Sequence, residues 1–96
     1  MTHGQFITLE GGEGVGKTTC IEHIQNKLVT QGISVVVTRE PGGTHLAEQI
    51  RQLLLDDHHE TIHSDTELLL MFATRAQHIS EVIRPALHAG KWVLCS

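Results

Sequence analysis

The sequence predicts an α/β fold in which a parallel sheet is flanked by helices, and three features near its start predict it. A short apolar segment, Phe6–Leu9, runs directly into a glycine-rich stretch. A helical pattern follows between Lys17 and Val29, and the nearly continuous β-branched run Ile33–Thr38 comes next. Strands that are covered on both faces are apolar along their whole length, so this order of elements indicates a parallel βαβ unit.

The glycine-rich stretch fits the phosphate-binding pattern G-x-x-x-x-G-K-[ST] at every fixed position. Glycines allow positive φ angles that turn backbone N–H groups toward a phosphate, and the following helix presents the positive end of its dipole to the same anion. The lysine of the pattern binds the β- and γ-phosphates, and the next hydroxyl binds Mg²⁺. We therefore predict a P-loop NTPase fold with a nucleoside triphosphate bound by Gly11, Gly12, Glu13, Gly14, Val15, Gly16, Lys17 and Thr18, and the metal at Thr18.

The first three elements are expected at Phe6–Glu10, Lys17–Val29 and Ile33–Thr38, with Gly32 ending the helix. The second strand then leads into Arg39-Glu40-Pro41-Gly42-Gly43. Ligands of open α/β sheets bind at the carboxyl ends of the strands, so we expect this loop to share one crevice with the phosphate-binding loop.

Two further helices and one strand are expected in the second half of the chain. Thr44–Leu55 has Leu46, Ile50, Leu53 and Leu54 at inward positions. The next helix starts near Asp65, with Ser64 or Asp65 as its cap, and Pro85 kinks or interrupts it before it ends at Gly90. Its inward positions are Leu68, Leu69, Met71, Phe72 and Ala76, and the strand Trp92–Cys95 follows.

Composition excludes several classes of protein. The net charge of −4, with seven Lys and Arg and 3% aromatic residues, argues against a nucleic-acid polymer as partner. The sequence has no membrane-spanning run and no basic start followed by an apolar core, so we expect a cytoplasmic protein without membrane contact. Cys20 and Cys95 make no metal-binding or redox spacing, and we expect two reduced, buried thiols.

The 96 residues are few for a parallel α/β domain, and Trp92–Cys95 leads into no further helix. We therefore interpret residues 1–96 as the N-terminal portion of a single domain.

Three stretches together resemble the bacterial thymidylate kinases: Glu10–Thr19, Thr38–Thr44 and Phe72–Gln77. The loop Arg39-Glu40-Pro41-Gly42-Gly43 is the most specific of them. The resemblance covers essentially the whole chain. It implies transfer of the γ-phosphoryl group of ATP to dTMP with Mg²⁺, and a homodimer when intact. It also implies that residues 1–96 are the N-terminal portion of a single P-loop kinase domain with strand order 2-3-1-4-5, of which strands 1 to 3 lie here. The strand Phe6–Glu10 would then lie at an open sheet edge, and an isolated chain of this length is expected to be marginally stable or to associate.

The resemblance also implies roles for single residues. Lys17 and Arg39 are the catalytic residues, and Glu13 faces the sugar hydroxyl of dTMP. Glu40 and Pro41, joined by a cis peptide bond, bring backbone close to dTMP. Arg51 binds the dTMP phosphate and Arg75 the thymine base. For Glu13, Arg51 and Arg75, a solvated surface side chain is the alternative interpretation.

One position departs from the family's pattern. The base-stacking phenylalanine lies four residues before the base-binding arginine in the family, and that position is Met71 here, with Phe72 one residue later. Met71 can cover the base through its polarizable sulfur, or Phe72 can stack on it if the helix rotates slightly. Both residues stay candidates for dTMP binding.

Two other functions remain open at this point. One is a P-loop kinase with another small acceptor, for which Met71 is the only indication. The other is a nucleotide-dependent switch in which hydrolysis drives a conformational change. Arg51 and Arg75, directed at a second small molecule, favour the kinase.

Overall fold

The computed structural model describes residues 4–10 and 16–96. The chain forms two compact units, Met1–Thr38 with Ile83–Ser96, and Arg39–Val82.

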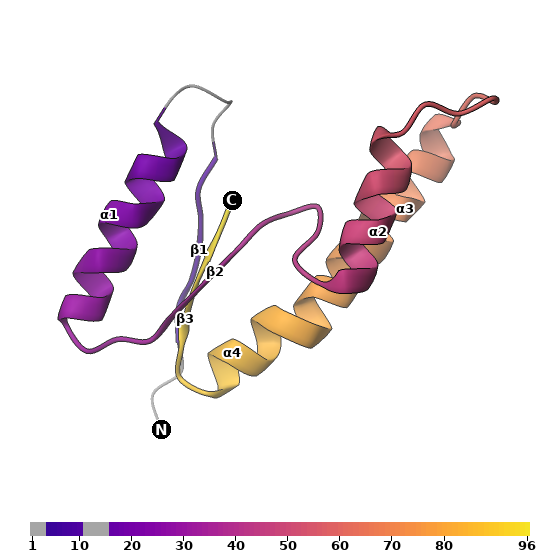
Figure 1. The fold of residues 1–96 in the computed structure, drawn as a ribbon. Helices are drawn as coiled ribbons and strands as arrows, with labels where there is room; N and C mark the ends of the chain where they lie inside the picture. Colours follow the sequence, from indigo (N-terminus) through magenta and orange to yellow (C-terminus); the bar gives the residue numbers. More distant parts are fainter. Residues whose placement is uncertain (1–3, 11–15) are drawn as a thin grey trace. The chain divides into compact units, whose positions relative to one another are not determined.

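The first unit contains a parallel sheet of three strands, β1 (Phe6–Thr8), β2 (Val35–Thr38) and β3 (Trp92–Cys95). β3 lies between the other two, so that Val93 pairs with Phe6 on one side and with Val36 on the other (Figure 1). The expected neighbours, strand 2 beside strand 3 and strand 3 beside strand 1, are confirmed.

The core of this unit is centred on β3. Val93 and Leu94 are 0% exposed, and Cys95 is also buried. Successive side chains of a strand point to opposite faces of the sheet, so the burial of Val93, Leu94 and Cys95 shows that β3 is covered on both faces and explains why it is apolar throughout. β1 pairs with β3 alone among the described strands, and Phe6 is exposed there.

α1 (Lys17–Thr30) packs against β2. It ends as expected at Gly32, whose φ of 80° suits glycine, and the N–H of Ile33 donates to the carbonyl of Leu28 at 2.9 Å. Leu28 is buried. Cys20 is exposed, so the expectation of two buried thiols is wrong for Cys20 and confirmed for Cys95. Cys20 lies about 100° around the helix from its neighbour Ile21 and so falls outside the buried stripe.

The second unit contains α2 (His45–Leu55) and α3 (Ser64–His78), which lie side by side (Figure 1). Thr44 caps α2, since its Oγ1 accepts a hydrogen bond from the N–H of Ala47 at 3.0 Å. The expected cap of α3 is wrong. Its N-cap is His63, which makes no side-chain capping hydrogen bond, and Asp65 lies within the first turn. A carboxylate there stabilises the helix through the dipole instead.

The interruption expected at Pro85 lies in the turn before the proline. α3 continues into a π-helical segment, η1 (Ile79–Ile83), and then into α4 (Arg84–His88), which packs against β3. Pro85 has no N–H to donate, and its ring would collide with the preceding turn of a regular α-helix. Widening that turn to π geometry removes the conflict, and Pro85 then occupies the first turn of α4.

The expected apolar faces of α2 and α3 are less buried than predicted. The exposed members are Leu46, Leu53, Leu68, Leu69, Met71 and Phe72, and Ala76 is exposed with them. A helix buries only the part of its apolar surface that a neighbouring element covers, and these side chains lie on the parts of α2 and α3 that remain exposed. Within residues 4–10 and 16–96, no helix is both long and apolar enough to span a bilayer.

Candidate active site

The first unit contains the start of α1, where phosphate binding is predicted. Gly16 precedes the helix with a φ of 77°, a left-handed conformation in which a side chain would be strained. Lys17 and Thr18 form the start of the first turn, where backbone N–H groups have no partner within the helix. This end of the helix therefore suits an anion. The other predicted loop residues, Gly11, Gly12, Glu13, Gly14 and Val15, lie outside the described residues.

The loop after β2 belongs to the second unit and has two unusual backbone features. The peptide bond between Glu40 and Pro41 is cis, as the resemblance implies. Gly42 and Gly43 follow with φ angles of 132° and 90°, which favour glycine. Gly42 is buried, and a Cβ atom there would collide with the carboxylate of Glu48. The path of the loop thus favours glycine at both positions.

Arg39 at the start of this loop is held by Glu48, a residue of the first turn of α2. Nε of Arg39 donates to Oε1 of Glu48 at 3.0 Å, and Nη2 donates to Oε2 at 2.7 Å. The N–H of Gly43 also donates to Oε1, at 3.1 Å. The Glu48 carboxylate therefore links the Arg39 side chain, at the start of the loop, to the backbone N–H of Gly43 near the end of the loop.

These contacts change the protonation of both side chains. Hydrogen bonding to Arg39, followed by the N–H of Gly43, lowers the pKa of Glu48 from 4.5 to about 2, and Arg51 contributes by its charge. Hydrogen bonding to Glu48, together with the charge of that carboxylate, raises the pKa of Arg39 further above its usual value. Both groups are therefore charged at neutral pH. The influence of Arg51 arises because it follows Glu48 by three residues on the same face of α2.

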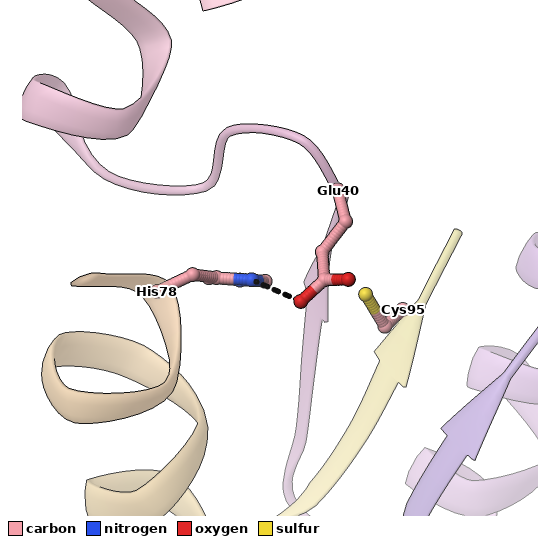
Figure 2. A group of neighbouring side chains, drawn as sticks. All are labelled: Glu40, His78 and Cys95. Atoms are coloured by element: carbon pink, nitrogen blue, oxygen red, sulfur yellow. Dashed lines mark hydrogen bonds and ion pairs between the residues drawn. The ribbon is translucent and has the colours of Figure 1, made fainter. Parts of the chain in front are cut away.

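Glu40 contacts two side chains of α3. Its Oε2 accepts from Nε of Arg75 at 3.3 Å, and its Oε1 lies 3.4 Å from Nδ1 of His78. In Figure 2 the ring of His78 points toward the Glu40 carboxylate. Arg75 is 56% exposed on its side chain, whereas His78 is fully buried. Arg75 thus has donors left for a ligand, and His78 supports Glu40 from the interior.

Apart from Glu13, which lies outside the described residues, the residues predicted to bind dTMP lie in the second unit with Arg39, which was predicted to be catalytic. Arg39 and Arg51 lie around Glu48, and Glu40 lies against Arg75. Met71 and Phe72 are 43% and 54% exposed, so both can still cover a base.

Sequence reasoning missed Glu48 and His78. Glu48 had a detectable signal, because a carboxylate in the first turn of a helix faces back toward the loop that precedes it. His78 follows Arg75 by three residues and therefore lies on the same helical face. Neither spacing resembles a known motif, which is why neither residue was selected.

The fold is that of a P-loop NTPase. Its parallel sheet has β3 in the centre, and a glycine, a lysine and a threonine stand at the start of α1. The sequence model of the thymidylate kinase family matches residues 9–96, so the chain belongs to that family.

Individual relatives agree with this assignment. A thymidylate kinase of Psychrobacter sp. (strain PRwf-1) is 58% identical over 95 residues, which are 99% of this chain and 45% of the relative. That of Ectopseudomonas mendocina (strain ymp) is 62% identical over 92 residues, 96% of this chain and 44% of the relative. The crystal structure of thymidylate kinase from Ehrlichia chaffeensis superposes with a TM-score of 0.78 at 39% identity, covering 97% of this chain and 53% of that one. The chain thus spans about half the length, or less, of the relatives it matches.

Proposed function

We propose that the protein transfers the γ-phosphoryl group of ATP to dTMP and forms dTDP, a step in dTTP biosynthesis. The observation that carries this proposal is the match of residues 9–96 to the thymidylate kinase family. The arginines of the second unit support it, because a kinase for a nucleoside monophosphate needs cations for the acceptor phosphate as well as for ATP. In this proposal the chain contributes the N-terminal part of one kinase domain.

Phosphoryl transfer depends mainly on positioning and on neutralising charge. Lys17 and the amides of the phosphate-binding loop would hold the donor phosphates. Arg39 would stabilise the charge that develops on the transferred group, and Arg51 would bind the acceptor phosphate, where a guanidinium can form two parallel hydrogen bonds. Arg39 remains charged throughout the working pH range, since Glu48 raises its pKa.

The nucleoside part of dTMP would meet the other group of residues. Arg75 would donate to the thymine base from its exposed guanidinium, which Glu40 already holds by one edge. Met71 or Phe72 would cover the base, and Glu13 would face the sugar hydroxyl. Pro41 would bring the loop backbone close to the acceptor.

Mg²⁺ fits the residues at the start of α1. Thr18 is exposed in the first turn, and its hydroxyl is a hard oxygen ligand of the type that Mg²⁺ prefers. When bound, the ion would neutralise charge on the β- and γ-phosphates.

We also expect a homodimer that works in the cytoplasm, where its phosphorylated substrates are found. The exposed leucines of α2 and α3, Leu46, Leu53, Leu68 and Leu69, support self-association, since an apolar surface of this kind is costly to leave in water. Sedimentation of the protein expressed from its own gene tests the dimer. A nucleic-acid polymer is not expected as a partner, because the net charge of −4 gives no electrostatic attraction for one.

The proposed reaction is tested by measuring ADP formation from ATP and Mg²⁺ with dTMP, dUMP, dCMP, dAMP and dGMP. The protein is expressed from its own gene for this assay. We expect dTMP to give the highest kcat/KM. ADP formation that is equally fast without any acceptor would indicate a hydrolysing switch, and a preference for another monophosphate would indicate a different kinase.

A further inference from the structure

Three N–H groups converge on the carboxylate of Glu48. Two come from Arg39, at 3.0 and 2.7 Å, and one comes from the backbone of Gly43, at 3.1 Å. The two-point contact with Arg39 fixes the plane of the guanidinium as well as its position, which a single hydrogen bond would not do. Glu48 thereby sets both the direction of one side chain and the path of the loop that follows it.

Glu48 makes its ion pair across the loop, although Arg51 lies three residues away on the same helix. Helical neighbours at this spacing often pair. Because Glu48 pairs with Arg39, the guanidinium of Arg51 remains available to a ligand. The backbone fits this pairing, since a glycine at position 42 leaves space for the Glu48 carboxylate.

Stability alone does not account for this arrangement. The side chains of Arg39 and Glu48 are 53% and 37% exposed, and ion pairs so open to water contribute little to the free energy of folding. A guanidinium has five N–H donors, of which Glu48 receives two. The remaining three keep a fixed orientation and stay available to phosphate oxygens. The pairing therefore orients a cation more than it stabilises the fold.

We propose that Glu48 is a positioning residue that acts through Arg39, holding the guanidinium in the orientation that phosphoryl transfer requires. This inference rests on the proposed function, because the role of Arg39 in catalysis is part of that proposal. We assign Glu48 no contact with either substrate. Its effect on turnover passes through the orientation of the Arg39 guanidinium.

A double-mutant cycle in the protein expressed from its own gene tests the inference. Glu48→Ala should lower kcat by about tenfold to a hundredfold, since a misplaced catalytic group can cost that much. The KM for ATP should change less than about twofold, because Lys17 and the loop amides bind the donor. Glu48→Gln, which keeps an acceptor for Gly43 but loses the charge, should fall between Glu48→Ala and the wild type.

The decisive comparison is between Arg39→Ala and the double variant Arg39→Ala/Glu48→Ala. If Glu48 acts only through Arg39, the double variant should be no slower than Arg39→Ala. Losses that multiply would overturn the inference. Glu67→Gln is the matched control, because Glu67 also lies in the first turn of its helix and has no assigned role. Glu48→Ala with the same kcat as Glu67→Gln would overturn the inference as well.

A second measurement separates this inference from the proposed function. The side-chain Nε–H signal of Arg39 in an NMR spectrum, assigned by its loss in Arg39→Lys, reports the contact directly. It should shift in Glu48→Gln and stay in place in Glu67→Gln. An unshifted signal would overturn the inference even if the protein phosphorylates dTMP. A protein that does not phosphorylate dTMP would refute the proposed function, and the inference with it, whatever this signal does.

Discussion

Nδ1 of His78 lies 3.4 Å from Oε1 of Glu40, so a fully buried imidazole supports a carboxylate that also holds Arg75. Glu40 follows β2, and His78 ends α3. The contact therefore ties the loop after the second strand to a helix 38 residues later in the chain.

His78→Ala is expected to weaken dTMP binding and to lower stability together. Removing a buried side chain leaves a cavity, and Oε1 of Glu40 loses a partner, so the free energy of unfolding should fall by about 1–3 kcal/mol. Glu40 would then hold Arg75 less firmly, and we expect the KM for dTMP to rise severalfold. Denaturant unfolding and steady-state kinetics measure the two effects.

His88→Ala serves as the control for His78→Ala, because His88 is exposed in the last turn of α4. Its stability and KM should stay close to those of the wild type. A His78→Ala protein with unchanged KM for dTMP would show that His78 serves packing alone.

Arg75→Ala is expected to raise the KM for dTMP about tenfold to a hundredfold and the KM for ATP less than about twofold. A hydrogen bond from a charged donor to the base is made with the acceptor nucleotide only, so its loss affects one substrate. Arg75 is largely exposed, and its removal should leave thermal stability almost unchanged. Initial rates with each substrate varied in turn provide the test.

Arg84→Ala is the matched control for Arg75→Ala, since Arg84 is exposed at the start of α4 and has no assigned role. Equal increases in both KM values for Arg75→Ala would contradict a base-binding role.

Sequence patterns predicted the elements well where a local signal was strong. The β-branched run before Thr38 became β2, and Gly32 ended α1 as expected. Pro85 did signal an irregular helix, but its missing N–H affects the turn before it, where η1 lies. The depth of burial of Leu68 or Leu69 was not predictable, because periodicity shows which face is apolar and not what covers it.

The residues of the candidate site that belong to a known motif could be predicted from the sequence. Glu40 and Arg75 were selected through a resemblance and do lie together. Glu48 and His78 act on other side chains, and such contacts depend on how a loop and a helix pack in three dimensions. A single sequence contains no spacing rule for them.

Lys17→Ala is expected to reduce turnover to the limit of detection while the fold persists. Lys17 lies half-buried at the first position of α1, and its charge would act on the transferred phosphoryl group. A coupled assay for ADP and a circular dichroism melt measure the two properties. Lys27→Ala, in the last turn of the same helix, is the control and should stay active. Unchanged turnover in Lys17→Ala would contradict the assignment of Lys17 to phosphate binding.

The ion pair of Glu48 predicts a small, pH-dependent contribution to stability. Its folded-state pKa of about 2 lies below its usual 4.5, so the contribution is complete above 4.5 and disappears as the pH falls toward 2. The melting temperature of the wild type should therefore exceed that of Glu48→Gln slightly at neutral pH, and the difference should vanish near pH 2. High salt should reduce it, because both groups are open to solvent. Melting curves of both proteins, with Glu67→Gln as control, measure this difference. A difference that grows as the pH falls from 4.5 to 2 would contradict the pairing with Arg39.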